Sequence, residues 1–267
     1  MRYESPMPPA DLFNPDHYVD VRRPLVEAST LPSWCYTDPR FYQREVEQIF
    51  LKHWNFAGRV DQLSNPGDFM TLDFFGESVI LVRGKDNVIR TFANVCRHRS
   101  ARLLEGEGNC RTIVCPYHSW VYGLDGSLLR MKGMEETRNF NPEENSLREL
   151  RTELWAGFIF VSFNPDINPL DEYLGNLSEH FKSYQFSSMR CVRQKRYDLE
   201  CNWKLYIENA MEDYHTATVH RGLSEIRTVF QSPLMGNGTL YTSKPLQPSR
   251  YYPKTTQTYP TSMGCRV

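Results

Sequence analysis

The sequence predicts an α+β protein in which a small antiparallel β domain lies between helical segments. Apolar and polar residues alternate with a period near two through much of residues 55–95 and again through 154–163, which is typical of strands. A turn signal, Pro66-Gly67, falls inside the first stretch. Residues 37–54 and 202–214 show helical periodicity instead.

Composition excludes several classes of function. The chain has 267 residues and a net charge of −1, with no basic block that would mark a nucleic-acid surface. Its apolar runs are shorter than the roughly 18 residues that a membrane helix needs, and residues 1–20 lack the apolar core of a secretory signal. We therefore expect a cytosolic or organellar protein without nucleic-acid or membrane partners. The seven cysteines are odd in number, which favours reduced thiols.

The N-terminal elements are a wrapping segment and a helix. Residues 1–36 are rich in proline and polar side chains, and we expect them to cover a neighbouring surface without carrying chemistry. Thr37-Asp38-Pro39 then supplies a capping residue and a proline, which together predict the start of a helix. The apolar stripe of this helix ends near Trp54.

Four strands follow from the alternating stretches. Three of them lie in the first half of the chain, near the predicted turns at Pro66-Gly67 and residues 84–87. The last is rich in aromatic and β-branched residues and ends at Asn164. The predicted strands are Phe69–Phe74, Ser78–Val82, Val88–Val95 and Leu154–Phe163.

A cluster of metal-ligand types lies inside this β domain. Cys96 and His98 form one group, and Cys115 and His118 form the second. Two thiolates and two imidazoles suit either a zinc ion or a [2Fe–2S] cluster in which one iron takes both sulfurs and the other takes both histidines. A zinc finger usually pairs like ligands locally, whereas here each group contributes one of each kind, which favours the cluster.

The flanking residues carry a family resemblance. Cys96-Arg97-His98-Arg99 and Cys115-Pro116-Tyr117-His118-Ser119-Trp120 resemble the Rieske box of ring-hydroxylating oxygenase α subunits. The resemblance implies that Cys96 and Cys115 hold the inner iron of the cluster and that His98 and His118 hold the outer one. We interpret Trp120, Tyr122, Trp155 and Trp203 as packing residues.

A second informative stretch is the helix predicted from Asn202 to Tyr214. Its apolar residues recur at helical spacing, and Glu208, Glu212 and His215 lie along another side. His220 follows five residues after His215, a step that turns two imidazoles apart on an unbroken helix, so we expect the helix to bend or end between them. Taken alone, these could be two ordinary histidines near a helix end.

This stretch resembles the mononuclear-iron segment of the same family. The matching residues are Asn202-Trp203-Lys204, Glu208-Asn209, Tyr214-His215 and His220. The resemblance implies that His215 and His220 belong to a 2-His-1-carboxylate triad that holds non-haem Fe(II). It also implies that Glu212 bridges His215 and the Rieske ligand His118 of an adjacent subunit through hydrogen bonds, with Asp213 as the rival carboxylate.

The third iron ligand has no evident source. In the family it is an acidic residue far downstream, but after His220 this sequence has no Asp and a single Glu, Glu225. We therefore expect the chain to stop inside the catalytic sheet. The implied parts are a wrapping segment (1–36), a Rieske [2Fe–2S] domain with a leading helix (37–163), and the N-terminal part of a helix-plus-antiparallel-sheet catalytic domain (164–267).

The implied activity is that of the terminal component of a Rieske oxygenase. Such a protein uses O2 and electrons from NAD(P)H, delivered by a separate ferredoxin or flavin reductase, to hydroxylate or demethylate an aromatic or quaternary ammonium substrate. Glu at position 212 points to the branch that oxidises choline, betaine or carnitine. The expected assembly is a homotrimer or α3β3. A Rieske-type electron carrier and a non-catalytic relative are the alternatives.

Overall fold

The computed structural model describes residues 7–134, 136–212 and 215–220. They form two compact units. The sheet unit comprises Gln43–Gln194, and the helical unit comprises the described residues up to Tyr42 and from Lys195 onward. None of the helices in the described ranges combines the length and apolar character that crossing a membrane requires.

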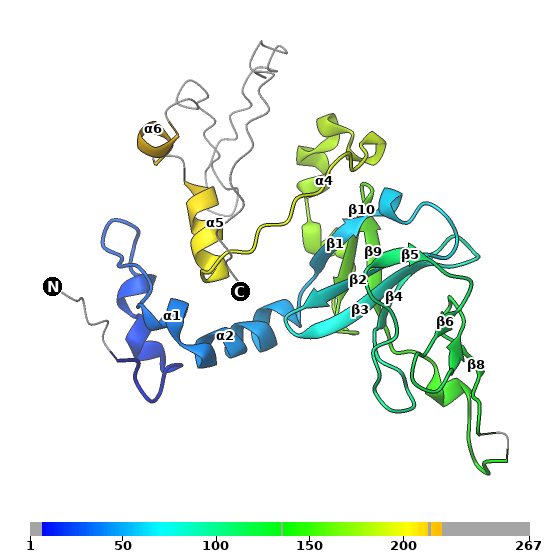
Figure 1. Ribbon diagram of the computed structural model, residues 1–267. Coiled ribbons are helices and arrows are strands. Elements are labelled where there is room, and N and C mark those ends of the chain that lie inside the picture. The colour runs from blue at the N-terminus through cyan, green and yellow to red at the C-terminus, as the bar shows by residue number, and fades with distance from the viewer. Residues whose placement is uncertain (1–6, 135, 213–214, 221–267) are drawn as a thin grey trace, which may run out of the picture. The chain divides into compact units, whose positions relative to one another are not determined.

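The sheet unit is built on antiparallel strands in two sheets (Figure 1). A seven-stranded sheet has the order β1-β10-β9-β4-β3-β2-β5, and a three-stranded sheet has the order β6-β7-β8. The strands are β1 (Asn55–Arg59), β2 (Asp68–Phe74), β3 (Glu77–Arg83), β4 (Ile89–Ala93), β5 (Glu107–Asn109), β6 (Ile113–Val114), β7 (Val121–Tyr122), β8 (Leu128–Arg130), β9 (Glu149–Trp155) and β10 (Phe158–Ser162).

The three predicted strands of the first half are confirmed as β2, β3 and β4. The prediction of one strand over Leu154–Phe163 is wrong, because the chain reverses in its middle and forms the hairpin of β9 and β10. Ala156 and Gly157 make the turn with φ values of +50° and +86°. Two consecutive positive φ values are typical of a two-residue hairpin loop. Apolar residues on both sides of this short loop hide the reversal in the sequence.

Strand β3 is buried on both faces because its side chains alternate between two cores. Val79 and Leu81 pack in a core that includes residues of β1, β2 and β10. Ile80 and Val82 pack in a second core, which joins the three-stranded sheet to the other face of the large sheet. This second core also contains Cys96 and Cys115, so the two metal-ligand groups of the sequence lie in a packed interior.

The two outer strands of the large sheet are short or irregular. β5 has three residues, all exposed. β1 pairs with β10, but its register shifts between Phe56 and Gly58, as in a β-bulge. Gly58 adopts φ +143°, which suits glycine at such a bulge.

A buried ion pair ties the end of the sheet unit to its first strand. Arg59 Nε donates to the Asp61 carboxylate at 2.8 Å, and these side chains are 11% and 10% exposed. The Arg59 guanidinium also donates to the carbonyl oxygens of Phe186 and Met189. The backbone N–H of Cys191 donates to the second carboxylate oxygen of Asp61 at 2.8 Å. Residues 186–191 are therefore fixed beside β1.

Short helices complete the described chain. Helix α2 begins at Pro39, as predicted, and Asp38 accepts the backbone N–H of Arg40 at 2.8 Å. It continues as a π-helical turn and ends at Phe50 rather than near Trp54. The helices are α1 (Trp34–Thr37), α2 (Pro39–Glu45), α3 (Leu170–Leu174), α4 (Leu177–His180), α5 (Trp203–Met211) and α6 (Thr216–Val219), with the π turn η3 (Val46–Phe50) and 3-10 turns η1 (Pro15–Tyr18), η2 (Asp20–Arg22), η4 (Val60–Gln62), η5 (Glu143–Asn145), η6 (Lys182–Tyr184) and η7 (Phe186–Ser188).

Helix α5 confirms the predicted helix, with a different end. Asn202 is its N-cap, and the Asn202 side chain accepts the backbone N–H of Lys204 at 3.0 Å. The helix ends at Met211, one turn earlier than the apolar pattern indicates. Its apolar face is largely exposed in the described part of the chain, with Tyr206 at 60% and Met211 at 65%.

Candidate metal centres

Two loops of the sheet unit repeat the same backbone geometry around Cys96 and Cys115. In each loop the cysteine N–H donates to the carbonyl five residues later at 2.8 Å, and the cysteine carbonyl accepts the N–H four residues later at 3.0 Å. The residue at the fourth position, Ser100 or Ser119, has a positive φ of +54° or +58°. Each loop is thus a tight turn that projects its cysteine inward.

These loops bring the four predicted cluster residues together as two like pairs. Cys96 and Cys115 are each 2% exposed, and their side chains are within hydrogen-bonding contact. The rings of His98 and His118 are adjacent, with centroids 4.8 Å apart. Nδ1 of His118 is buried and has no hydrogen-bond partner among the described residues. A buried imidazole nitrogen of this kind is suited to a metal.

The pairing fits a two-iron cluster. Within the described ranges, no three His, Cys, Asp or Glu side chains are arranged to hold one metal ion. Instead, the two loops set thiol beside thiol and imidazole beside imidazole. A Rieske [2Fe–2S] cluster takes two cysteines on one iron and two histidines on the other, so the donor set and its division both suit this group.

Burial and neighbouring groups shift the pKa values of Cys115 and His98. Burial raises the pKa of the Cys115 thiol, although the N–H groups of His118 and Tyr117 directed at its sulfur oppose this effect. Desolvation lowers the pKa of His98, and the nearby His118 and Arg99 lower it further. The imidazole is therefore held in the neutral form that binds metals, and iron would favour the thiolate forms of the cysteines.

Two aromatic residues that the sequence predicted as packing residues also touch these side chains. Both are buried, so the packing prediction is confirmed for Trp120 and Tyr122. Trp120 stacks on the His98 ring with centroids 4.6 Å apart and planes inclined by 6°. Tyr122 Oη lies 3.3 Å from Cys96 Sγ. Sequence reasoning missed these contacts, although both residues directly follow the second ligand loop.

The second predicted centre lies at the end of α5. The Glu212 carboxylate forms a hydrogen bond with Nδ1 of His215 and accepts the backbone N–H of His215 at 3.2 Å. The rings of His215 and His220 are adjacent, with centroids 5.5 Å apart. A carboxylate on Nδ1 orients the ring and leaves Nε2 for a metal. The rival carboxylate Asp213 and the downstream Glu225 lie outside the described residues.

The chain changes direction twice around these histidines. Glu212 has extended backbone angles (φ −121°, ψ 153°) and ends α5. Helix α6 then runs from Thr216 to Val219 and ends before His220. The prediction that the first helix bends or ends between the two histidines is therefore wrong, because that helix already ends before His215. The β-branched residues of α6, however, form a helical turn rather than interrupt one. The earlier break at Glu212 was not predicted.

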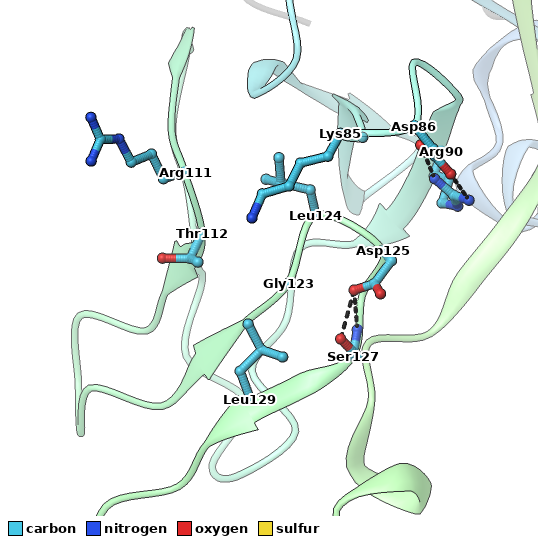
Figure 2. Close-up of a pocket in the computed structure, with 11 residues that line it drawn as sticks. Lys85, Asp86, Arg90, Arg111, Thr112, Gly123, Leu124, Asp125, Ser127 and Leu129 are labelled. Atoms are coloured by element: carbon cyan, nitrogen blue, oxygen red, sulfur yellow. Dashed lines mark hydrogen bonds and ion pairs between the residues drawn. The ribbon is translucent and has the colours of Figure 1, made fainter.

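A pocket of about 300 Å³ is lined by residues that flank the second ligand loop in the sequence and by residues of the 84–90 segment, and its lining contains neither thiol nor imidazole. Figure 2 shows the Lys85 side chain directed into the space between Arg111 and Leu124. Four of its polar side chains are engaged in two pairs, since Asp86 pairs with Arg90 and Asp125 accepts the Ser127 hydroxyl at 2.6 Å. The sequence did not predict this pocket.

Comparison with known proteins defines the class. Residues 53–141 match the family model of the Rieske [2Fe-2S] domain, and residues 186–263 match that of the ring hydroxylating alpha subunit catalytic domain. The chain belongs to the family of Rieske non-haem iron oxygenase α subunits. The first domain implies an iron–sulfur cluster and the second implies iron.

Within this family the chain is similar to enzymes of the quaternary ammonium branch. It is 34% identical over 219 residues to the carnitine monooxygenase oxygenase subunit of Escherichia coli K12, covering 80% of this chain and 59% of the relative. It is also 34% identical over 221 residues to the chloroplastic choline monooxygenase of Beta vulgaris, covering 80% of this chain and 49% of the relative. The chain thus spans about half the length of these relatives.

Solved structures give the same result. The quaternary ammonium Rieske monooxygenase CntA in complex with L-carnitine superposes with a TM-score of 0.71 and 32% identity, over 74% of this chain and 57% of that one. Naphthalene 1,2-dioxygenase from Rhodococcus sp. bound to indole superposes with a TM-score of 0.63 and 28% identity, over 73% and 47% of the two chains.

Proposed function

We propose that this chain is part of the terminal oxygenase component of a Rieske monooxygenase or dioxygenase. In this proposal Cys96, Cys115, His98 and His118 hold a [2Fe–2S] cluster. The observation that supports this proposal most directly is the pair of loops with the same backbone geometry. These loops place two buried thiols side by side and two imidazoles side by side. The alternative of a single zinc ion would need all four ligands around one point.

His215 and His220 are the proposed protein ligands of a mononuclear ferrous ion. The cluster supplies one-electron transfer, and the ferrous ion supplies oxygen activation. Glu212 holds the His215 ring through Nδ1, which fixes the orientation of the ring and makes its other nitrogen more basic. Glu212 is also the proposed bridge to His118 of an adjacent subunit.

The proposed substrate is a quaternary ammonium compound of the choline, betaine or carnitine type. Two lines of support agree: the relatives are named carnitine monooxygenase and choline monooxygenase, and position 212 is Glu. An aromatic substrate is the second candidate, because naphthalene 1,2-dioxygenase is also a structural neighbour.

Electron supply requires partners. We infer a ferredoxin or flavin reductase that draws electrons from NAD(P)H, and a homotrimeric or α3β3 assembly. Support for electron transfer across a subunit boundary comes from one CntA structure, whose description refers to inter-subunit electron transfer.

The alternative of a Rieske electron carrier without oxygen chemistry makes a different use of the chain. A carrier needs the region of residues 53–141 alone, and it leaves the match of residues 186–263 without a role. An iron count separates the two: three irons per chain support the oxygenase, and two support the carrier.

The test of the cluster is anaerobic reconstitution with iron and sulfide, followed by metal analysis and EPR of the reduced protein. We expect two irons and two sulfides at this site and the EPR signal of a reduced Rieske cluster. Cys115→Ser should abolish both, whereas Cys191→Ser, at an exposed cysteine, should leave them unchanged. Protein that loads only zinc would refute the proposal.

A further inference from the structure

Lys204 alone is buried among the residues of α5, at 8% exposed. Its ammonium lies 5.2 Å from the ring centroid of Tyr36, 5.3 Å from that of Phe41 and 5.4 Å from that of Trp203. All three distances are within the range of cation–π attraction. We call these three rings the aromatic cage. A cation in the first turn of a helix is disfavoured by the helix dipole, so the stability of α5 alone does not explain a lysine here.

Tyr36 also forms two hydrogen bonds, one with a residue of α5 and one with its N-cap. Its hydroxyl donates to the Glu208 carboxylate at 2.8 Å, and its carbonyl accepts from the Asn202 side chain at 3.2 Å. Burial, and then Glu208, raise the pKa of Tyr36 to about 12, so its hydroxyl remains a donor. Lys204 and Glu208 are four residues apart and share one row of the helix.

The aromatic cage packs against N-terminal residues through Phe41. The Phe41 ring stacks on Phe13 with centroids 5.9 Å apart and lies 6.5 Å from the Tyr18 ring. Cys35, next to Tyr36, is 1% exposed. The described part of the predicted wrapping segment (1–36) thus packs in the same unit as the first turn of α5.

The row of α5 that contains Lys204 and Glu208 leads toward the proposed iron site. After Lys204 and Glu208, the next position four residues on is Glu212, which ends α5 and bonds to His215. We propose that Lys204 is a positioning residue: its ammonium, held in the aromatic cage, locks α5 against residues 34–41 and thereby sets the place of Glu212 and His215. This inference rests on the proposed function, since it assigns the row a purpose at the ferrous ion.

The experiment compares variants of the complete gene product that carries this sequence. Lys204→Met removes the charge, Lys204→Arg retains a cation for the cage, and Lys195→Met is the control at an exposed lysine of the same unit. Three properties are measured: amide hydrogen exchange of residues 203–211, the Fe(II) dissociation constant by chelator competition, and the EPR spectrum of the nitric oxide adduct of the ferrous ion, which reports ligand geometry.

We expect Lys204→Met to speed exchange in α5, to weaken Fe(II) binding about tenfold or more, and to alter the EPR spectrum, with Lys204→Arg close to wild type. Unchanged Fe(II) affinity and spectrum in Lys204→Met would overturn the inference. If wild-type protein binds no third iron, the proposed function fails. If, in addition, hydrogen exchange in α5 is faster in Lys204→Met, Lys204 stabilises the helix without positioning an iron ligand. That result overturns the positioning inference on its own ground.

Discussion

The Tyr122 hydroxyl lies 3.3 Å from the sulfur of Cys96 and accepts the backbone N–H of Arg97 at 3.0 Å. A thiolate sulfur has no proton to donate, so when Cys96 is a thiolate the Tyr122 hydroxyl is the donor in this contact. Burial, and then Cys96, raise the pKa of Tyr122, so the hydroxyl stays protonated. A hydrogen bond to a cluster sulfur favours the more negative, reduced state.

Tyr122→Phe should therefore lower the reduction potential of the cluster. One hydrogen bond of about 1 kcal/mol corresponds to about 40 mV for a one-electron couple. The measurement is an EPR-monitored redox titration of the reconstituted protein, with Tyr184→Phe as the control at an exposed tyrosine. Equal potentials in wild type and Tyr122→Phe would show that the hydroxyl does not tune the cluster.

Gly126 is held in a conformation and a space that exclude a side chain. Its φ is +83°, and an added Cβ would lie 2.5 Å from Cε1 of the buried Phe92. We expect Gly126→Ala to lower the free energy of unfolding by about 3 kcal/mol, through strain and overpacking. Gly76→Ala is the matched control, since Gly76 has φ +92° and open space around it; it should cost about 1 kcal/mol. Urea denaturation measures both, and equal losses would contradict the packing argument.

The Asp86 carboxylate should titrate at low pH. The Arg90 guanidinium, and then the N–H of Val88, lower the pKa of Asp86 from 3.8 to about 2. A lowered pKa means that this ion pair contributes stability above pH 4 and loses that contribution as the pH falls toward 2. Arg90→Gln should raise the pKa of Asp86 toward 3.8 in an NMR pH titration. A pKa that stays near 2 in Arg90→Gln would exclude Arg90 as the main cause.

Glu212→Gln should slow electron transfer from the cluster to the ferrous ion and should weaken binding of that ion. The neutral amide lacks the negative charge that makes the carboxylate a strong acceptor for the imidazole N–H, and loss of such an outer partner typically costs 10- to 100-fold in metal affinity or activity. We expect losses of that order in substrate turnover and in the rate of cluster reoxidation in the complete protein. Asp213→Asn tests the rival carboxylate. If Asp213→Asn impairs reoxidation and Glu212→Gln does not, the assignment belongs to Asp213.

The Arg59–Asp61 pair should contribute strongly to the stability of the sheet unit. Removing one partner of a nearly buried pair leaves an uncompensated charge, so Asp61→Asn should lower the free energy of unfolding by about 3 kcal/mol. Asp198→Asn breaks the exposed pair with Arg196 and should cost less than about 0.5 kcal/mol. Limited proteolysis after residue 186 should also become faster only in Asp61→Asn. Equal stabilities would indicate that backbone contacts alone hold residues 186–191.

The proximity of the four proposed cluster ligands could be predicted from the sequence because much of the information is local. Cys96 and His98, like Cys115 and His118, lie on tight turns, so the spacing within each pair already constrains the geometry. The strands β2, β3 and β4 are also predictable, since Pro66-Gly67 precedes β2 and the 84–87 turn separates β3 from β4. The domain boundaries, the roles of the site residues and the place of Glu212 between two subunits stay predictions.

One local turn and several non-local contacts account for much of what the sequence does not predict. The hairpin at Ala156 depends on a turn conformation that alternation does not encode. The contact of Tyr122 with Cys96 joins residues 26 positions apart, and that of Tyr36 with Glu208 joins residues 172 positions apart. Helical periodicity likewise favoured the Tyr206 face of α5 for packing, whereas the buried residue is Lys204. Such pairings depend on the tertiary structure, which single-sequence patterns do not contain.

The borders of the large sheet have a consequence for self-association. An unpaired strand with a long flat backbone can recruit a strand from another molecule and seed aggregates. β5 offers three exposed residues, and β1 is bent by its bulge, so neither border provides such a template. The sheet unit is therefore protected against fibril-like growth by its own geometry.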